Sequence, residues 1–160
     1  MYNIVRLLAL MLSLLLLLLP LHGCSNGRRS CRYLIPSGYV GFVRIDYGVS
    51  GAPSLPLEQG FLLFRIPSTG YLQTSTAFVG GRGEDEFYYV TGNQRQQVHG
   101  ESDGYPTGSQ PPIPMVWGRL VGGGRAESVY EMFFIGTKKQ YEEFGKKHRN
   151  SVEFPDIPLR

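Results

Sequence analysis

The sequence contains few of the residues that bind metal ions or act as nucleophiles. Its 160 residues include two cysteines and three histidines, and only 18% are charged. His22, His99 and His148 lie at no metal-binding spacing from one another or from a cysteine, so we expect no zinc site. No serine occupies a Gly-x-Ser-x-Gly motif, which excludes a nucleophile elbow. No catalytic residue, cofactor or metal is therefore predicted.

Basic residues are also too scattered for a nucleic-acid-binding surface. The formal net charge is +3, and Lys and Arg form no long run. By contrast, the chain is rich in turn formers and aromatics, with 21 Gly, 11 Pro, ten Tyr and nine Phe. This composition favours short strands joined by many turns.

The N-terminus has the pattern of an export signal. A weakly basic start with Arg6 precedes Leu7 to Leu19, in which only Ser13 is polar, and Pro20 ends the run. About thirteen residues fit the apolar region of a signal peptide and fall short of the ~20 that span a bilayer. We therefore predict a signal peptide over residues 1–23.

Leu21-His22-Gly23-Cys24 resembles the bacterial lipobox, although His22 departs from its usual small or aliphatic residue. The resemblance implies cleavage before Cys24 and acylation of its thiol with chains such as palmitate. Ser25 replaces the Asp that retains such proteins in the inner membrane of enterics, so the outer membrane is favoured if the organism has one. Residues 24–32 are predicted to be a lipidated tether whose arginines face anionic headgroups.

Two alternatives stay open for this segment. Ile4 to Leu21 could be an uncleaved single-span anchor, because Arg28, Arg29 and Arg32 downstream favour a cytoplasmic C-terminal side. Cys24 and Cys31 could instead form a small disulfide loop.

Residues 33–150 are predicted to be one domain of mostly β structure, followed by an extended tail over 151–160. We expect a small β-sandwich of seven to eight short antiparallel strands with one short helix from Lys138 to about Lys147. A long exposed loop is predicted from Gly100 to Pro114. The predicted strands are two within Tyr33–Tyr47, then Phe61–Ile66, Tyr71–Phe78, Phe87–Thr91, Arg95–Val98, Met115–Val121 and Ser128–Ile135.

A short motif occurs twice in this domain. Ile35-Pro36-Ser37-Gly38-Tyr39-Val40 is repeated as Ile66-Pro67-Ser68-Thr69-Gly70-Tyr71-Leu72. Each copy reads as strand, proline turn, glycine, aromatic residue and strand. We interpret the two copies as equivalent corners of one sandwich.

The opening Tyr33-Leu34-Ile35-Pro36-Ser37-Gly38-Tyr39-Val40-Gly41-Phe42-Val43-Arg44-Ile45 resembles a family of bacterial envelope domains of unknown function. Gly70-Tyr71-Leu72, Phe87-Tyr88-Tyr89 and Phe133-Phe134-Ile135-Gly136-Thr137 are similar too, so the resemblance covers about residues 33–145. It implies a shared fold and an envelope location, and it carries no activity.

Three polar or aromatic groups are candidate sites. Arg44 and Asp46 share one strand face, with Tyr47 beside it at the strand end, and predict a cross-strand ion pair or, less favoured, a ligand-recognition surface. For Phe87-Tyr88-Tyr89 we expect packing in the core, and a platform on which sugars stack is the less favoured interpretation. Glu84-Asp85-Glu86 is interpreted as a solvated turn. A calcium site is less favoured, because consecutive strand positions point to opposite faces.

Two glycine-rich segments and one thiol complete the candidates. Gly80–Gly83 and Gly122–Arg125 read as flexible turns, since neither opens a helix as a phosphate loop does. Cys31 is predicted to be an incidental thiol.

The sequence thus predicts a lipid-anchored, non-catalytic binding or structural module whose partners are the membrane and an envelope protein or glycan. The alternative is an envelope hydrolase acting on cell wall or glycan. That alternative requires two carboxylates about 5–9 Å apart in one groove. The carboxylates available for such a pair are Asp46, Glu58, Glu84 and Glu86.

Overall fold

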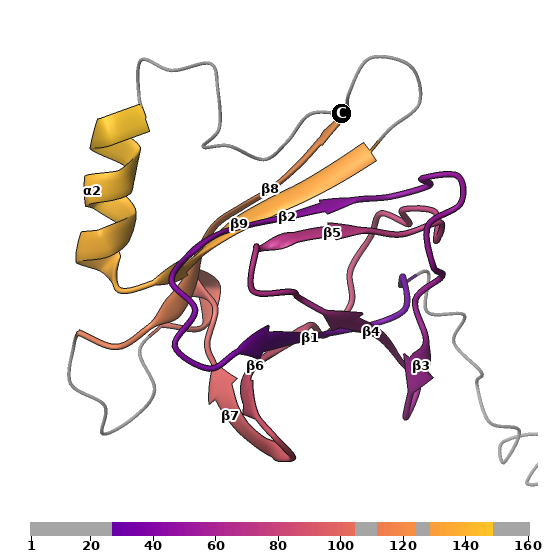
Figure 1. Ribbon diagram of the computed structural model, residues 1–160, viewed down its shortest axis with the longest axis horizontal. Helices are drawn as coiled ribbons and strands as arrows, with labels where there is room; N and C mark the ends of the chain where they lie inside the picture. Colours follow the sequence, from indigo (N-terminus) through magenta and orange to yellow (C-terminus); the bar gives the residue numbers. More distant parts are fainter. Residues whose placement is uncertain (1–26, 105–111, 124–128, 149–160) are drawn as a thin grey trace, which may run out of the picture.

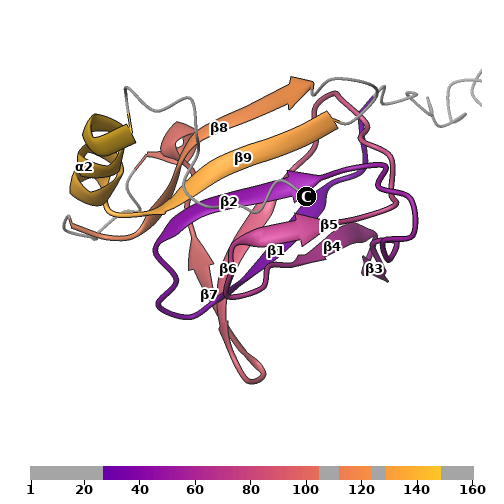
Figure 2. The same cartoon turned by 45° about the horizontal axis from the view of Figure 1, so that its top comes forward.

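The computed structural model describes residues 27–104, 112–123 and 129–148. Within these residues, nine strands form two sheets that pack face to face, as Figures 1 and 2 show. Sheet A has the strand order β3-β4-β1-β6-β7, and sheet B has the order β5-β2-β9-β8. The predicted β-sandwich with one C-terminal helix is therefore confirmed.

The strands of sheet A are β1 (Cys31–Pro36), β3 (Leu57–Glu58), β4 (Phe61–Arg65), β6 (Glu86–Thr91) and β7 (Gln94–Val98). The strands of sheet B are β2 (Gly41–Asp46), β5 (Tyr71–Gln73), β8 (Met115–Gly123) and β9 (Val129–Gly136). A 3-10 turn, η1 (Glu101–Asp103), and the helix α2 (Lys138–His148) complete the described elements.

Alternation along each strand decides which side chains enter the sandwich. In β2, Val43 and Ile45 are fully buried, whereas Phe42, Arg44 and Asp46 are partly exposed on the outer face. The inner side chains of both sheets form the main core. A second cluster of Met115, Trp117 and Phe134 lies on the outer face of sheet B under α2. Burial on both faces explains why β9 is almost entirely apolar.

Two equivalent corners carry the chain from sheet A to sheet B. β1 pairs in parallel with β4, and β2 pairs in parallel with β5, so the two strand-corner-strand units lie side by side. The Tyr39 N–H donates to the Pro36 carbonyl at 3.0 Å, and the Gly70 N–H donates to the Pro67 carbonyl at 2.9 Å. The interpretation of the repeated motif is confirmed.

The sheets are mixed: among the described residues, four strand pairs are antiparallel as predicted, and the prediction is wrong for three. The pairs β1–β4, β1–β6 and β2–β5 are parallel. Alternation shows which face of a strand is buried but not which strand lies beside it or in which direction. β5 also ends at Gln73, well before the predicted Phe78, because the buried Thr74 turns and donates its hydroxyl to the Pro53 carbonyl at 2.9 Å.

Several predicted features lie outside the described residues. They are the signal peptide (1–23), the lipidation residue Cys24, most of the loop over 100–114, and the tail over 151–160. Among the residues that are described, no helix is both long and apolar enough to cross a membrane. β1 begins at Cys31, within the predicted tether and two residues before the predicted start of the domain.

Candidate functional site

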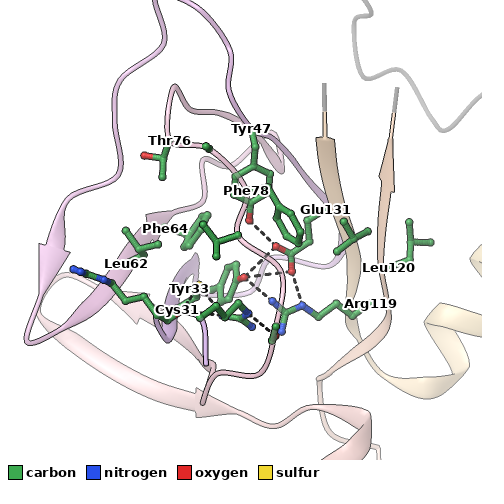
Figure 3. A pocket seen from close by; sticks show the side chains of 16 residues that line it. Cys31, Tyr33, Tyr47, Leu62, Phe64, Thr76, Phe78, Arg119, Leu120 and Glu131 are labelled. Carbon is green, nitrogen blue, oxygen red and sulfur yellow. Dashed lines mark hydrogen bonds and ion pairs between the residues drawn. The ribbon is translucent and has the colours of Figure 1, made fainter. Parts of the chain in front are cut away.

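A cavity of about 480 Å³ lies between the sheets at the end where β1 begins, and we call it the inter-sheet cavity. This end is opposite the corner that joins β1 to β2 (Figure 1). Apolar side chains form most of its wall, with a few polar groups on one side (Figure 3). The residues that line it include Arg28, Arg29, Cys31, Tyr33, Tyr47, Leu62, Phe64, Ala77, Phe78, Val79, Gly81, Arg119, Leu120, Val121 and Glu131.

Tyr33 is held at the cavity wall by its neighbours in sheet A. The parallel register of β4, β1 and β6 places it opposite Phe64 and Phe87. Its ring stacks on theirs, with centroid distances of 4.6 Å and 4.5 Å. Such cross-strand stacking fixes the ring, so that its hydroxyl points across to sheet B.

Glu131 of β9 is the polar centre of the cavity. Its side chain is 1% exposed and points into the sandwich, as those of Phe133 and Ile135 do. The Tyr47 hydroxyl donates to it at 2.7 Å, and the Tyr33 hydroxyl donates at 3.1 Å. The Nε of Arg119 forms a third bond (Figure 3). A buried carboxylate is tolerated only when it is paired and hydrogen-bonded in this way.

A β-bulge brings Arg119 to Glu131. Trp117 pairs with Phe134 and Leu120 pairs with Met132, so two residues of β8 lie opposite Phe133. The extra residue turns Arg119 inward, where regular alternation would place it on the outer face. Gly118 begins the bulge with a φ of +58°, and a Cβ there would overlap the Tyr141 ring.

Asp85 joins the N-terminal segment to this arrangement. Its carboxylate accepts hydrogen bonds from Arg28 (Nη1 at 2.8 Å), from Arg119 and from the backbone N–H of Cys31 at 3.0 Å. Asp85 is 6% exposed as a side chain. Arg28, Asp85, Arg119 and Glu131 therefore form one chain of alternating charges, which we call the ion-pair chain.

The charges of these groups follow from their surroundings. Burial acts to raise the pKa of Asp85, but the hydrogen bond from Arg28 and the charge of Arg119 outweigh it and lower that pKa below its ordinary value. Burial, with a further contribution from Glu131, raises the pKa of Tyr33 and Tyr47 well above the ordinary range. Both hydroxyls therefore remain protonated and donate to Glu131.

Cys31 lies beside the ion-pair chain and is a buried free thiol. Burial, reinforced by the charge of Asp85, raises its pKa to about 11, although Arg28 opposes this. A thiol with such a pKa is largely protonated at neutral pH and is a poor nucleophile.

The ion-pair chain also borders a second hollow of about 850 Å³. This hollow shares Arg28, Gly81 and Arg119 with the inter-sheet cavity and is lined by Glu84, Glu101 and Asp103, among others. In the described part of the chain, no group of His, Cys, Asp and Glu side chains is arranged to hold a metal ion.

The predicted Arg44–Asp46 pair forms, with Nε to Oδ1 at 2.8 Å, but it lies within one strand on the outer face of sheet B. Tyr71 donates to Asp46 at 2.7 Å, and the Arg44 guanidinium lies 4.7 Å from the centre of the Tyr130 ring. Tyr47 points to the opposite face, into the inter-sheet cavity. Tyr47 thus shares the buried face of Val43 and Ile45, as alternation along this segment predicts, and takes no part in the pair.

Of the four carboxylates of the hydrolase alternative, two come together. Glu58 and Glu86 both bind Arg32, at 2.8 Å and 2.7 Å, and are thus paired with a cation. Asp46 is in sheet B, and Glu84 is exposed beside the second hollow. Arg32 is thus paired within sheet A, as Arg28 is paired with Asp85, and Arg29 is the exposed arginine of the predicted tether.

The prediction of a solvated acidic turn is wrong for Asp85, which is buried between two arginines. Phe87 and Tyr89 are buried in the main core, as the sequence predicted, and Tyr88 lies on the other face of β6. His99 is partly exposed and contributes to neither hollow.

Sequence reasoning missed Glu131 and Arg119, and it assigned Asp85 to a solvated turn and Arg28 to the tether. One signal was present. Glu131 is a single carboxylate at a core-facing position of an otherwise apolar strand, and such a residue is rarely buried without a partner. Arg119 had no such signal, because its inward direction depends on the bulge.

The fold is similar to that of a protein whose structure has been solved. A crystal structure of a protein from Bacillus anthracis, designated a candidate lipoprotein, is similar, with a TM-score of 0.51 and 22% sequence identity. The similarity covers 81% of this chain and 85% of the other. A search of curated protein sequences finds no match. A family described as one of unknown function, DUF6843, matches residues 28–144, and the chain therefore belongs to that family.

Proposed function

We propose that the chain is a lipid-anchored, non-catalytic binding module of the cell envelope, which holds a small ligand in the inter-sheet cavity. The observation that carries this proposal is the composition of the cavity. Its wall is mainly apolar, and its central carboxylate, Glu131, is already bound by three donors. Concave, largely apolar sites with a few fixed polar groups are typical ligand sites.

The anchor is supported by the sequence and by the similar structure. The apolar leader ends at a lipobox-like segment before Cys24, and the similar protein from Bacillus anthracis is designated a candidate lipoprotein. The first strand, β1, begins at Cys31, seven residues after Cys24. Such a short connection suits a domain held at a membrane surface.

The arrangement of acids supports binding over hydrolysis. A glycosidase needs one carboxyl group that is free to donate a proton and a second that is free to act as a base or nucleophile. In the inter-sheet cavity, Glu131 is bound to Arg119, and Asp85 nearby is bound to Arg28 and Arg119. An apolar wall also favours a ligand with apolar surface over a glycan.

The anchor is tested by intact-mass measurement of the protein extracted from membranes, beside a Cys24→Ser variant. We expect a mature chain that begins at an acylated Cys24, and an unacylated, uncleaved chain for Cys24→Ser. An uncleaved and unacylated wild-type chain contradicts the anchor.

The binding role is tested by native mass spectrometry of the same protein and of an Ala77→Trp variant. Ala77 lines the cavity and is exposed, so the larger side chain fills the cavity without entering the core. We expect a non-covalently bound small molecule in the wild type and its loss in Ala77→Trp. Ser68→Trp, in the exposed β4–β5 corner, is the matched control and should retain the molecule. An empty wild-type protein contradicts the proposal.

A further inference from the structure

Exposed apolar side chains gather around the inter-sheet cavity. Val79, Leu120 and Val121 all line it and are 61%, 45% and 49% exposed. We call these three residues the apolar rim. Val40, also exposed, lies at the β1–β2 corner at the other end of the sandwich. Exposed apolar residues around an opening mark a surface for a lipid or another partner.

The start of the domain fixes the distance between this rim and the predicted lipid. Arg28 lines the cavity, and its Nε donates to the Gly81 carbonyl at 3.1 Å, two residues from Val79. Cys24 precedes Arg28 by four residues. Because consecutive Cα atoms are 3.8 Å apart, the two Cα atoms are separated by at most about 15 Å. A lipid on Cys24 therefore holds the bilayer surface close to the rim.

The charge beside the rim suits the same surface. Arg29 lines the cavity, Arg82 lies three residues after Val79, and both are exposed. Basic side chains near an apolar surface are attracted to the anionic headgroups of a membrane. The lipid bilayer is thus the occupant that both the rim and the arginines fit.

We propose that the apolar rim rests on the bilayer and that the inter-sheet cavity takes the acyl chain of a membrane lipid. This inference rests on the proposed function and names the ligand class of that site. Leu62, Phe64 and Phe78 offer the acyl chain an apolar wall. The two arginines and two carboxylates of the ion-pair chain balance one another, so a ligand in the cavity needs no charged group to neutralise them. The lipid headgroup stays at the mouth, beside Arg29.

Photo-crosslinking in vesicles tests the ligand. The mature wild-type protein is reconstituted into phosphatidylcholine and phosphatidylglycerol vesicles that contain a phospholipid with a diazirine near the end of one acyl chain. We expect crosslinks on the peptides that carry Leu62, Phe64 and Phe78, lost in Ala77→Trp and kept in Ser68→Trp. Crosslinks that are absent from these peptides, or unchanged by Ala77→Trp, overturn the inference.

Fluorescence quenching tests the orientation. Val79→Cys and Val40→Cys are labelled with bimane in the same vesicles, where the buried Cys31 is protected from the label. Lipids with a shallow nitroxide should quench the label at position 79 and not at position 40. Equal quenching at both positions shows that the rim does not face the bilayer.

These results separate the inference from the proposed function. The intact mass of each sample reports the lipid on Cys24 independently of crosslinking. An acylated protein whose cavity holds a molecule other than a lipid keeps the proposed function and overturns the inference. An unacylated chain overturns the anchor of the proposed function.

Discussion

At the scale of single residues, the site depends on how one carboxylate is kept in an apolar interior. Glu131 lies on the same face of β9 as Phe133 and Ile135. Its oxygens accept hydrogen bonds from the hydroxyls of Tyr33 and Tyr47 and from the guanidinium of Arg119. Each donor replaces part of the hydration that the carboxylate loses on burial. Removing one member therefore leaves each of its neighbours with one hydrogen-bond partner fewer in a largely buried site.

Glu131→Gln should lower the free energy of unfolding by about 3 kcal/mol, because Arg119 and the hydroxyls of Tyr33 and Tyr47 lose the charged acceptor that they share. Tyr47→Phe removes only one donor to a charged group and should cost about 2 kcal/mol. Urea unfolding followed by circular dichroism measures both changes. The matched control is Glu142→Gln on the exposed face of α2, which should change stability by less than about 0.5 kcal/mol. Equal effects of Glu131→Gln and Glu142→Gln contradict this role for Glu131.

At the scale of elements, the two repeated corners have the same chain path but different surroundings. Gly38 and Gly70 have φ values of +76° and +74°, a region that favours glycine. A Cβ on Gly38 would meet open space, whereas one on Gly70 would overlap the Tyr39 hydroxyl and the Phe42 carbonyl. Gly70 thus serves both the backbone turn and the close packing of the first corner against the second.

Alanine at these two positions separates the two effects. Gly38→Ala should cost about 1 kcal/mol, which is the strain of a left-handed alanine. Gly70→Ala should cost about 3 kcal/mol or more, because overpacking is added to the same strain. Denaturant unfolding of both variants gives the comparison. Equal losses would show that the second corner tolerates a methyl group.

The elements also show what the sequence could and could not predict. Alternation over Val43, Ile45 and Tyr47 predicts the buried face of β2, and the turn at Gly92-Asn93 predicts the hairpin of β6 and β7. Both signals are local. The parallel pairing of β1 with β4 and β6 is a property of the whole chain path, and no local pattern encodes it. The bulge that turns Arg119 inward likewise depends on pairing with β9.

At the scale of the whole molecule, the two ends of the sandwich are stabilised differently. Near α2, Trp117, Phe134 and Tyr141 pack together on the outer face of sheet B. At the end with the cavity, the ion-pair chain joins the N-terminal segment, the loop before β6, and strands β8 and β9. Because ion pairs depend on protonation and apolar contacts do not, acid should weaken the cavity end first.

Asp85 gives this difference a measurable pH dependence. Its pKa is lowered from the ordinary value of 3.8, so the folded protein stabilises the charged form. The stabilisation is fully present above the unfolded-state pKa and is lost as pH falls through the lower folded-state pKa. Asp85→Asn should therefore cost about 3 kcal/mol at neutral pH, since it leaves Arg28 and Arg119 without their shared partner.

The difference in unfolding free energy between wild type and Asp85→Asn should be constant from about pH 5 to 7 and shrink as pH falls below about 4. Glu58, whose pKa Arg95 and Arg32 lower to about 2, titrates in the same range, but it is present in both proteins and cancels from the difference. Glu84→Gln, at the exposed acid next to Asp85, is the matched control and should change stability by less than about 0.5 kcal/mol at neutral pH. A difference that stays constant down to pH 2 means that the charge of Asp85 does not stabilise the cavity end.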